Sequence, residues 1–270
     1  MSCPICSSTM HHCFKAEVLG KYQAQYKVCN TCGYLSAHNP YWLDESYTRA
    51  IANADTGLVI RNFILANKIS RVLYWILNER GRGQYLDAAG GYGMLTRLMR
   101  DFGFNFYWAD KYCENIVAPG FEYDTKLGFC SAVTAIEVLE HVLDPRGFLE
   151  GILNLSGAST IIFTTELYEG EPPNPNDWWY YSFATGQHIG FFQHRTLKKI
   201  ATDLGLNFTS ANGVHIFSKK IISPFLFRLV TNRYLSIFVP VLIRRKLTSK
   251  TIPDYEFMMR KLDHNQNAKL

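Results

Sequence analysis

The sequence contains neither a secretory signal nor a membrane-spanning segment. It opens with MSCPIC, which lacks the basic start and the apolar core of a signal peptide. No apolar run approaches the roughly 20 residues that a spanning helix needs. The net charge of +5 over 270 residues is also low for a protein that binds nucleic acid through a basic surface. We therefore expect a cytoplasmic protein without a nucleic-acid partner.

Seven cysteines are present, and four of them form two Cys-x-x-Cys pairs, which are Cys3, Cys6, Cys29 and Cys32. In a chain expected to be intracellular, this spacing favours metal binding over disulfides. Each turn directs two thiolates at one point, and two turns supply the four ligands of a closed tetrahedral zinc site. A site of this kind has no open position for water, so its role is structural or recognitional. Alternative ligands in the intervening loop are His11, His12 and Cys13.

The stretch between the two cysteine pairs alternates like a β-hairpin, at Tyr22, Ala24, Tyr26 and Val28. The N-terminal module therefore resembles a zinc ribbon. Its basic residues from Cys3 to Cys32 are three lysines without any arginine. We expect a fixed cap that borders a substrate cleft.

The segment YLDAAGGYGMLT, residues 85–96, has the pattern of the first βα unit of a nucleotide-binding sheet. A short apolar run ends in Asp87, a glycine-rich turn follows, and a helical pattern begins at Met94. Glycine lets the backbone approach a ligand where a Cβ atom would collide. A second apolar run ends in Asp110, at about the distance where such folds place an acid for the ribose hydroxyls.

Glycine-rich turns of this kind serve dinucleotides as well. Aligned as G-x-G-x-x-G from Gly91, the chain has Thr96 where the last glycine or alanine is needed for helix packing. Aligned as D-x-G-x-G-x-G, it has Asp87, Ala89, Gly91 and Gly93, with only the first glycine replaced. This pattern resembles motif I of the Rossmann-like S-adenosylmethionine-dependent methyltransferases.

A second segment, AIEVLEHVLDP at residues 135–145, is similar to the E-V-L-E-H-x-x-D-P segment that ends the fourth strand in the same enzymes. The resemblance covers roughly residues 84–206. It implies an α/β fold, a Rossmann-like doubly wound, mostly parallel sheet, with S-adenosylmethionine as cofactor. It also implies which residues form the site. Asp87, Ala89, Gly90, Gly91 and Gly93 belong to the turn under the methionine part of the cofactor, and Asp110 binds the ribose. Glu137, Glu140 and His141 border the cleft.

A third segment narrows the resemblance. Gly186-Gln187-His188, with a following Phe-Phe pair and a Thr-Leu helix start, is similar to sugar and natural-product methyltransferases that carry an N-terminal zinc module. By that match His188 is a candidate general base, Tyr180 or Tyr181 a helper, and His141 a further catalytic candidate. A hydroxyl nucleophile needs such a base, and histidine titrates near neutral pH. The alternative for His188 is a hydrogen-bonded structural histidine in a turn.

Deoxysugar C-methyltransferases of this group have Gly-Glu-His, whereas this chain has Gln187 in place of the glutamate. We therefore prefer O-methylation of a sugar or glycan precursor, small or linked to a nucleotide or lipid, over C-methylation. Two other hypotheses stay open. One is a binding or scaffold protein with a vestigial cofactor domain, and the other is RNA methylation guided by the ribbon.

The expected organisation has four parts: a zinc ribbon over 1–40, a linker and flanking helix over 41–82, the methyltransferase domain over 83–218, and a C-terminal helical extension and tail over 219–270. The sheet needs a third strand, for which Gly120-Phe121-Glu122 is the candidate. Apolar residues with flanking cations follow residue 219. We expect a helical pair there, packed on the domain or on a second subunit, with contact to a membrane surface as the alternative. We expect the tail after Asp263 to be disordered. The sequence leaves the oligomeric state open.

Overall fold

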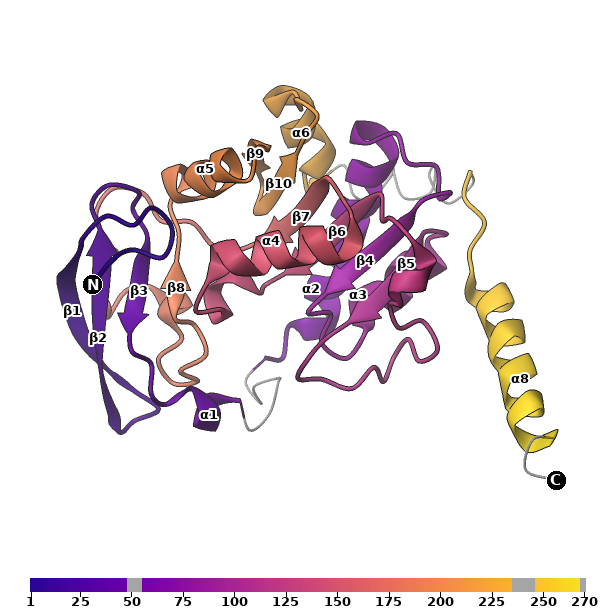
Figure 1. Ribbon diagram of the computed structural model, residues 1–270, viewed down its shortest axis with the longest axis horizontal. Coiled ribbons are helices and arrows are strands. Elements are labelled where there is room, and N and C mark those ends of the chain that lie inside the picture. Colours follow the sequence, from indigo (N-terminus) through magenta and orange to yellow (C-terminus); the bar gives the residue numbers. More distant parts are fainter. Residues whose placement is uncertain (48–54, 235–245, 268–270) are drawn as a thin grey trace.

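The protein folds around two β-sheets, as the computed structural model shows (Figure 1). The structure describes residues 1–47, 55–234 and 246–267. The smaller sheet has the order β1-β2-β3-β8 and the larger one β5-β4-β6-β7-β10-β9. The strands are β1 (Met10–Val18), β2 (Tyr22–Cys29), β3 (Leu35–His38), β4 (Gln84–Ala88), β5 (Asn105–Ala109), β6 (Ala132–Ile136), β7 (Thr160–Thr164), β8 (Gly190–Phe191), β9 (Asn207–Ala211) and β10 (Val214–Ser218).

The larger sheet is mostly parallel. Strands β5, β4, β6 and β7 pair in parallel, while β10 runs antiparallel to both β7 and β9. Strands β6 and β7 are buried on both faces, as expected for apolar central strands. The chain passes from β4 to β5 on one side and then returns to β6 on the other. The strand order therefore reverses between β4 and β6, and open α/β sheets bind ligands at such a reversal.

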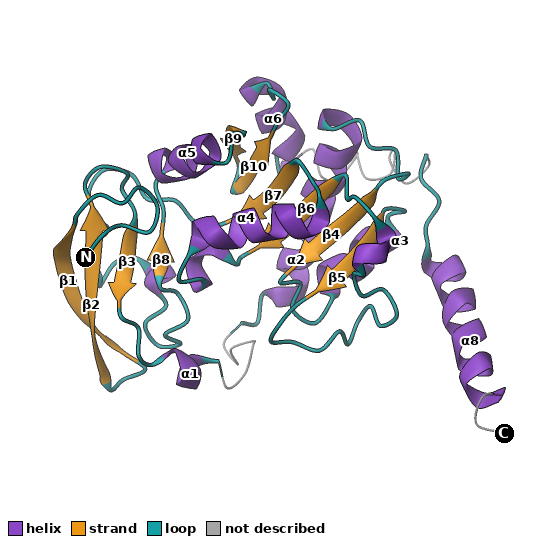
Figure 2. Cartoon of the chain, in the orientation of Figure 1, coloured by secondary structure: helices purple, strands orange, loops and turns teal. Residues whose placement is uncertain are grey.

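Helices cover both faces of this sheet (Figure 2). The longer helices are α2 (Leu58–Arg71), continued by a π-helical turn over Val72–Ile76, α3 (Met94–Asp101), α4 (Pro145–Ser156), α5 (His194–Asp203), α6 (Pro224–Thr231) and α8 (Thr251–Asn267); α1 (Leu43–Ser46) is a single turn. Alternate residues of the strands point to opposite faces. In β7, Ile161 and Phe163 pack with α4 and α5, whereas Ile162 packs with α2, α3 and α6. The predicted doubly wound α/β fold is confirmed.

The smaller sheet is joined to the larger one through the segment that contains β8. This short strand lies just after His188 and pairs with β3, with Leu35 opposite Phe191 and Ser36 opposite Gly190. Two side chains add bonds across the same junction: Tyr168 donates to the Gly33 carbonyl at 2.5 Å and Thr196 donates to the Cys32 carbonyl at 2.7 Å. The N-terminal sheet therefore holds the backbone on one side of His188.

The expected third strand at Gly120-Phe121-Glu122 is wrong. Among the described residues this segment forms only one isolated bridge to the larger sheet, between Glu122 and Trp108. Gly120 has φ +88°, a left-handed conformation, and it follows Pro119, which has no N–H to donate. A turn of this kind leaves too few residues for a strand.

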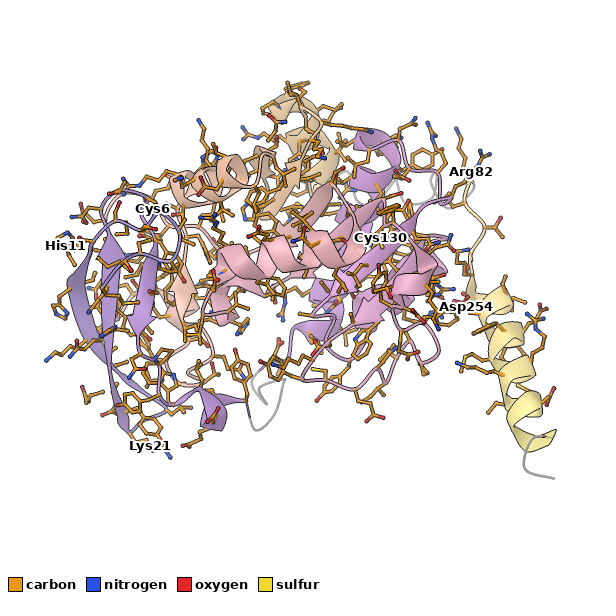
Figure 3. All side chains as sticks on the ribbon, in the orientation of Figure 1. Cys6, His11, Lys21, Arg82, Cys130 and Asp254 are labelled. Atoms are coloured by element: carbon orange, nitrogen blue, oxygen red, sulfur yellow. The ribbon has the colours of Figure 1, made fainter. Side chains whose placement is uncertain are left out.

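The C-terminal region contains helices at both ends of its described part. Helix α6 packs on the face of the sheet that α2 also covers. The expectation of disorder after Asp263 is wrong as far as Asn267, because α8 continues to that residue. Helix α8 is attached near its start, where Asp254, labelled in Figure 3, forms ion pairs with Arg100 and Arg97 of α3.

Part of the predicted C-terminal extension, Leu235 to Arg245, lies outside the described residues, so the membrane-surface alternative is untested. Within the part of the chain that the structure describes, no helix is long and apolar enough to cross a membrane.

Candidate active site

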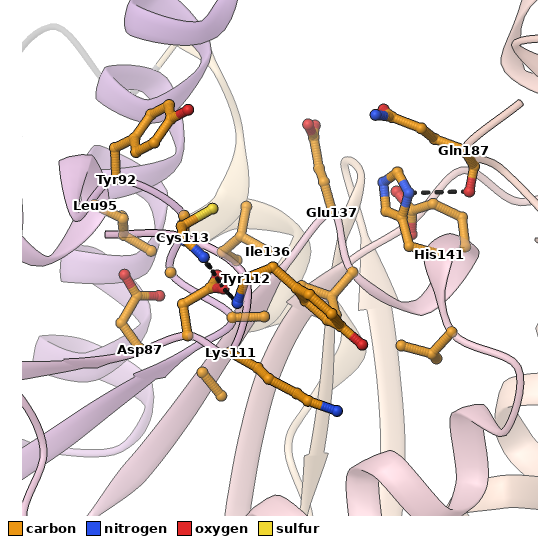
Figure 4. Close-up of a pocket in the computed structure, with 18 of the residues that line it drawn as sticks. Asp87, Tyr92, Leu95, Lys111, Tyr112, Cys113, Ile136, Glu137, His141 and Gln187 are labelled. Carbon is orange, nitrogen blue, oxygen red and sulfur yellow. Dashed lines mark hydrogen bonds between the residues drawn. The ribbon is translucent and has the colours of Figure 1, made fainter. Parts of the chain in front are cut away.

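A cavity of about 1500 Å³ opens at the carboxyl ends of β4, β5 and β6. Figure 4 shows it with Asp87 on one side, His141 and Gln187 on the other, and Glu137 between them. Binding sites for a single small ligand usually measure about 300 to 1000 Å³. The cavity therefore has room for two small molecules together.

The turn after β4 forms one wall of the cavity. Its backbone has left-handed φ values at Ala89 (+53°) and Gly91 (+54°), of which only the glycine accepts this conformation without strain. A Cβ atom on Gly90 would lie 2.8 Å from both the Asp87 carboxylate and the Trp108 ring. A Cβ atom on Gly91 would meet nothing within 4 Å. The bare backbone of Gly91 thus faces open space in the cavity.

Gly93 has a different role from the one predicted. It does not line the cavity, and as the N-cap of α3 it has φ +87°. A Cβ atom there would lie 2.4 Å from Asn115 Oδ1. The glycine is therefore needed for the packing of the turn on the next loop, and its predicted contact with the cofactor stays a prediction.

Asp87 is almost fully buried beneath this turn. Its carboxylate accepts hydrogen bonds from Thr96 at 2.9 Å and from Thr134 at 2.8 Å, which connect β4 to α3 and to β6. Burial raises the pKa of Asp87 to about 6, against the opposing effect of these two bonds. Asp87 lines the base of the cavity. Its bonds show that it also fixes the turn.

Asp110 closes the same wall from the end of β5. Its carboxylate accepts the backbone N–H of Gly91 at 2.9 Å, and those of Tyr112 at 2.7 Å and Cys113 at 2.9 Å. Trp108 donates from its indole to the Gly91 carbonyl at 2.7 Å. The glycine-rich turn and the β5 end are therefore locked together, and both line the cavity as the sequence predicts.

The opposite wall is formed by Glu140, His141 and His188. One ligand atom of each lies within 4.8 Å of the others, and the two imidazole rings are 4.8 Å apart between centroids. His188 Nδ1 lies 2.7 Å from the Tyr180 carbonyl, and His141 Nδ1 lies 3.1 Å from the Gln187 carbonyl. Because a carbonyl only accepts, each Nδ1 carries the proton, and each Nε2 is left as a lone-pair acceptor. Burial lowers the pKa of His141 to about 4, so this ring is neutral at pH 7.

The two candidate tyrosines differ. Tyr180 lines the cavity and its hydroxyl bonds Thr165 at 3.2 Å. Tyr181 does not line the cavity: its hydroxyl donates to the Pro173 carbonyl at 2.8 Å and its ring stacks on Phe183. The single 3₁₀ turn at residues 179–181 turns these neighbours to opposite sides. Tyr181 is therefore placed as a packing residue, and its predicted catalytic role, which no observation supports, stays a prediction.

Glu137 also lines the cavity, but its carboxylate is paired with Arg61 at 2.8 Å. Arg61 in turn holds Asp55 through two hydrogen bonds, at 2.9 and 2.7 Å. Burial raises the pKa of Glu137 to about 7, despite the opposing Arg61 charge. Glu137 has φ +54°, so the strand end is strained where it meets the cavity.

Sequence reasoning gave little weight to the rim of the cavity. Tyr47 and Tyr112 stack there with ring centroids 6.1 Å apart and an interplanar angle of 17°, and the Tyr47 hydroxyl lies 3.2 Å from His141 Nδ1. Tyr112 is 76% exposed. The only sequence signal for Tyr47 is its place in an aromatic, polar stretch, and Tyr112 follows Asp110 by two residues.

The four cysteines of the two pairs form a separate cluster, with their sulfur atoms within 4.8 Å of one another. The sulfur atoms of Cys3 and Cys32 lie 3.6 Å apart, and those of Cys6 and Cys29 lie 3.5 Å apart. Four thiolates around zinc at 2.3 Å have their sulfur atoms about 3.8 Å apart, so the donor set and the spacing fit a tetrahedral ion. The alternative ligands His11, His12 and Cys13 do not belong to the cluster among the described residues.

Residues 61–211 match the protein family described as "Methyltransferase domain". The chain belongs to this family. It is an S-adenosylmethionine-dependent methyltransferase, and the matched region contains the turn after β4, Asp110 and the opposite wall of the cavity. No curated protein sequence matches the chain.

Solved structures of methyltransferases are similar to the chain at low identity. Magnesium protoporphyrin IX methyltransferase from Synechocystis, with bound SAH, is 13% identical with a TM-score of 0.43, covering 65% of this chain and 90% of that one. An O-methyltransferase family 2 protein from Planctomyces limnophilus, in complex with apigenin, is 12% identical with a TM-score of 0.41 and covers 67% and 66%. Human N-acetylserotonin methyltransferase, in complex with SAM, is 13% identical with a TM-score of 0.40 and covers 67% and 66%.

Proposed function

We propose that the protein transfers the methyl group of S-adenosylmethionine to a hydroxyl group of a sugar or glycan precursor. The observation that carries this proposal is the arrangement of the cavity, which has the glycine-rich turn and Asp110 on one wall and His188 on the other. The nucleoside would lie over the turn, with its ribose hydroxyls on the Asp110 carboxylate. The acceptor would then lie between the methyl group and the histidine pair.

Methyl transfer is an in-line displacement at the sulfonium carbon, and a hydroxyl attacks poorly unless its proton is removed. In the metal-free protein, His188 is the residue suited to take that proton. Its Nδ1 donates to the Tyr180 carbonyl, so Nε2 has a free lone pair and a fixed direction. His141 belongs to the same wall, and Tyr180 limits the depth of the cavity.

Two features favour a sugar hydroxyl as the acceptor. Aromatic side chains at the cavity, Tyr47, Tyr112 and Trp179, offer flat apolar faces on which a sugar ring can stack. Gln187 argues against carbon methylation, because its amide cannot accept a proton from carbon. Its nitrogen donates to the Ser46 carbonyl at 2.9 Å.

The four-cysteine cluster is proposed to bind one structural zinc ion. Cys3, Cys6, Cys29 and Cys32 would fill its coordination sphere and leave no position for substrate. The ion would hold the end of β2 and the chain before β3, and through β3 it would support β8. It would therefore act on catalysis only by fixing the backbone beside His188.

The proposal is tested by incubating the purified protein with deuteriomethyl-labelled S-adenosylmethionine and a panel of nucleotide sugars and lipid-linked glycans. Mass spectrometry and NMR then locate the label. We expect a methyl ether on one sugar. A labelled carbon atom of the sugar would contradict O-methylation, and label transferred only to RNA would contradict a sugar acceptor.

A further inference from the structure

We infer that Glu140, His141 and His188 form a binding site for one divalent metal ion inside the methyl-transfer cavity. The cluster lies apart from the four cysteines, and it presents two imidazole nitrogens and one carboxylate to the same open volume as the cofactor turn. The chemical role that we assign to the ion below rests on the proposed function, whereas the binding of the ion does not depend on it.

Glu140 is the first observation behind this inference. It is 1% exposed, and neither oxygen of its carboxylate has a hydrogen-bond partner in good geometry within the described part of the chain. The Tyr180 hydroxyl lies beside this carboxylate: after burial, the Glu140 charge and a hydrogen-bonding contact with Glu140 raise the pKa of Tyr180 further, and the same hydroxyl also lies 3.2 Å from the Thr165 hydroxyl. A buried carboxylate with so little compensation is unfavourable, and a bound cation is a usual remedy.

The orientation of the two histidines is the second observation. Each ring bonds a backbone carbonyl through Nδ1, His188 to Tyr180 at 2.7 Å and His141 to Gln187 at 3.1 Å. Histidines that bind metals almost always donate their other ring N–H to such an acceptor, which fixes the tautomer and points the remaining nitrogen at the ion. Here that remaining nitrogen is Nε2 on both rings.

The spacing is the third observation. One ligand atom of each residue lies within 4.8 Å of the other two. Ligand atoms on one cation are about 3 to 4 Å apart, so side-chain rotations suffice to close the cluster. Two histidines and one carboxylate leave coordination positions open for exchangeable ligands. The open positions would face the acceptor.

The chemical consequence is an activated nucleophile. The acceptor's hydroxyl oxygen would bind the ion, which lowers the pKa of the hydroxyl so that its proton is released to water. The alkoxide oxygen then forms a bond to the methyl carbon while the carbon–sulfur bond breaks. The electron pair remains on sulfur and yields S-adenosylhomocysteine. With the ion bound, Nε2 of His188 is a metal ligand and cannot act as a general base. The ion then makes the acceptor hydroxyl acidic enough to lose its proton.

The test uses Mn²⁺ as the probe, with zinc left in the cysteine cluster, because Mn²⁺ prefers oxygen and nitrogen ligands over thiolates. Electron paramagnetic resonance of free Mn²⁺ measures binding without any need for a substrate. We expect one Mn²⁺ per chain in the wild type, and affinity at least tenfold weaker in Glu140→Gln and His188→Ala. The matched control is His12→Ala, because His12 is an exposed histidine on β1 that does not line the cavity.

Retained binding of S-adenosylhomocysteine shows that each variant is folded. The inference is overturned if the wild type binds no Mn²⁺, or if folded Glu140→Gln and His188→Ala bind it as the wild type does. Turnover that resists EDTA also overturns it, and leaves His188 as the base of the proposed function. Mn²⁺ binding that depends on Glu140, in a protein that methylates no sugar, would uphold the site and reject the sugar substrate.

Discussion

A substitution at Gly91 can separate an effect on cofactor binding from an effect on folding. The φ of Gly91 is +54° and a Cβ atom would meet no protein atom within 4 Å, so the added methyl group in Gly91→Ala would enter the cavity. We expect a loss of about 1 kcal/mol in stability from the left-handed conformation. We also expect at least a tenfold loss in affinity for S-adenosylmethionine, measured by calorimetric titration.

The matched control is Gly205→Ala. Gly205 has φ +67°, no atom within 4 Å of a Cβ atom, and a position after α5 that does not line the cavity. It should lose similar stability and keep its affinity. Equal affinities in the two variants would place the cofactor elsewhere.

Asp87 makes the stability of the protein depend on pH. Its pKa in the folded state is raised from 3.8 to about 6, mainly by burial, so folding favours the protonated form. The stabilisation is complete below the unfolded pKa and is lost as the pH rises through the folded one. The free energy of unfolding of the wild type, minus that of Asp87→Asn, should therefore fall by about 2 kcal/mol between pH 4.5 and 7.5. Urea unfolding at several pH values measures it, and a difference that is constant with pH contradicts this account.

Residues in the cavity were predictable where the chemistry is local in sequence. The turn from Asp87 to Gly91 belongs to one βα unit, and its pattern indicates the geometry directly. Tyr180 and Tyr181 are neighbours, by contrast, and only the packing of a 3₁₀ turn decides which ring lines the cavity. The two histidines were individually named, but His188 reaches His141 through the hydrogen bond from the Ile189 N–H to the Glu140 carbonyl at 2.7 Å, a long-range contact that leaves no local signal.

At the scale of elements, α8 is attached by a buried ion pair. Asp254 accepts two hydrogen bonds from Arg100, at 2.7 and 2.6 Å, and the Arg100 side chain is 6% exposed. In Asp254→Ala the guanidinium loses this partner in a buried place, which costs about 3 kcal/mol in the free energy of unfolding. Denaturant unfolding measures the loss. Asp263→Ala, on an exposed position of the same helix, is the control, and equal stability of the two variants would show that the pair contributes nothing.

The element order was largely predictable, because apolar runs and helical periodicity are properties of short windows. Strands β4 and β5 lie in the runs predicted to end at Asp87 and Asp110, and β6 ends in the segment predicted to close a strand. The prediction of a third strand was wrong because it was based on the usual number of strands in such a fold. Pro119 and Gly120 impose a turn at that place instead. The continuation of α8 beyond Asp263 was missed because its tail has polar residues without a clear apolar period.

At the scale of the whole molecule, the N-terminal sheet and the catalytic domain share one structural unit around β8. If zinc fills the cysteine cluster, its removal should loosen β3, and with it the backbone that holds His188. We expect native mass spectrometry to find one zinc ion per chain. Removing it with a thiol reagent and a chelator, and then restoring Mn²⁺ to the cavity, should lower the melting temperature by roughly 10 °C and turnover at least tenfold.

Cys13→Ser is the control for this experiment, because Cys13 lies between the cysteine pairs but outside the cluster. This variant should keep its zinc and its melting temperature. Full turnover in the zinc-free protein would show that the N-terminal module does not support the catalytic wall.

The most direct test of the central claim is a crystal structure of the protein with S-adenosylhomocysteine. The account predicts the ribose hydroxyls on the Asp110 carboxylate, the amino-acid part over the backbone of Gly91, and the sulfur atom facing the wall of His141 and His188. A nucleoside bound outside this cavity, or an Asp110 carboxylate without contact to the ribose, would contradict it.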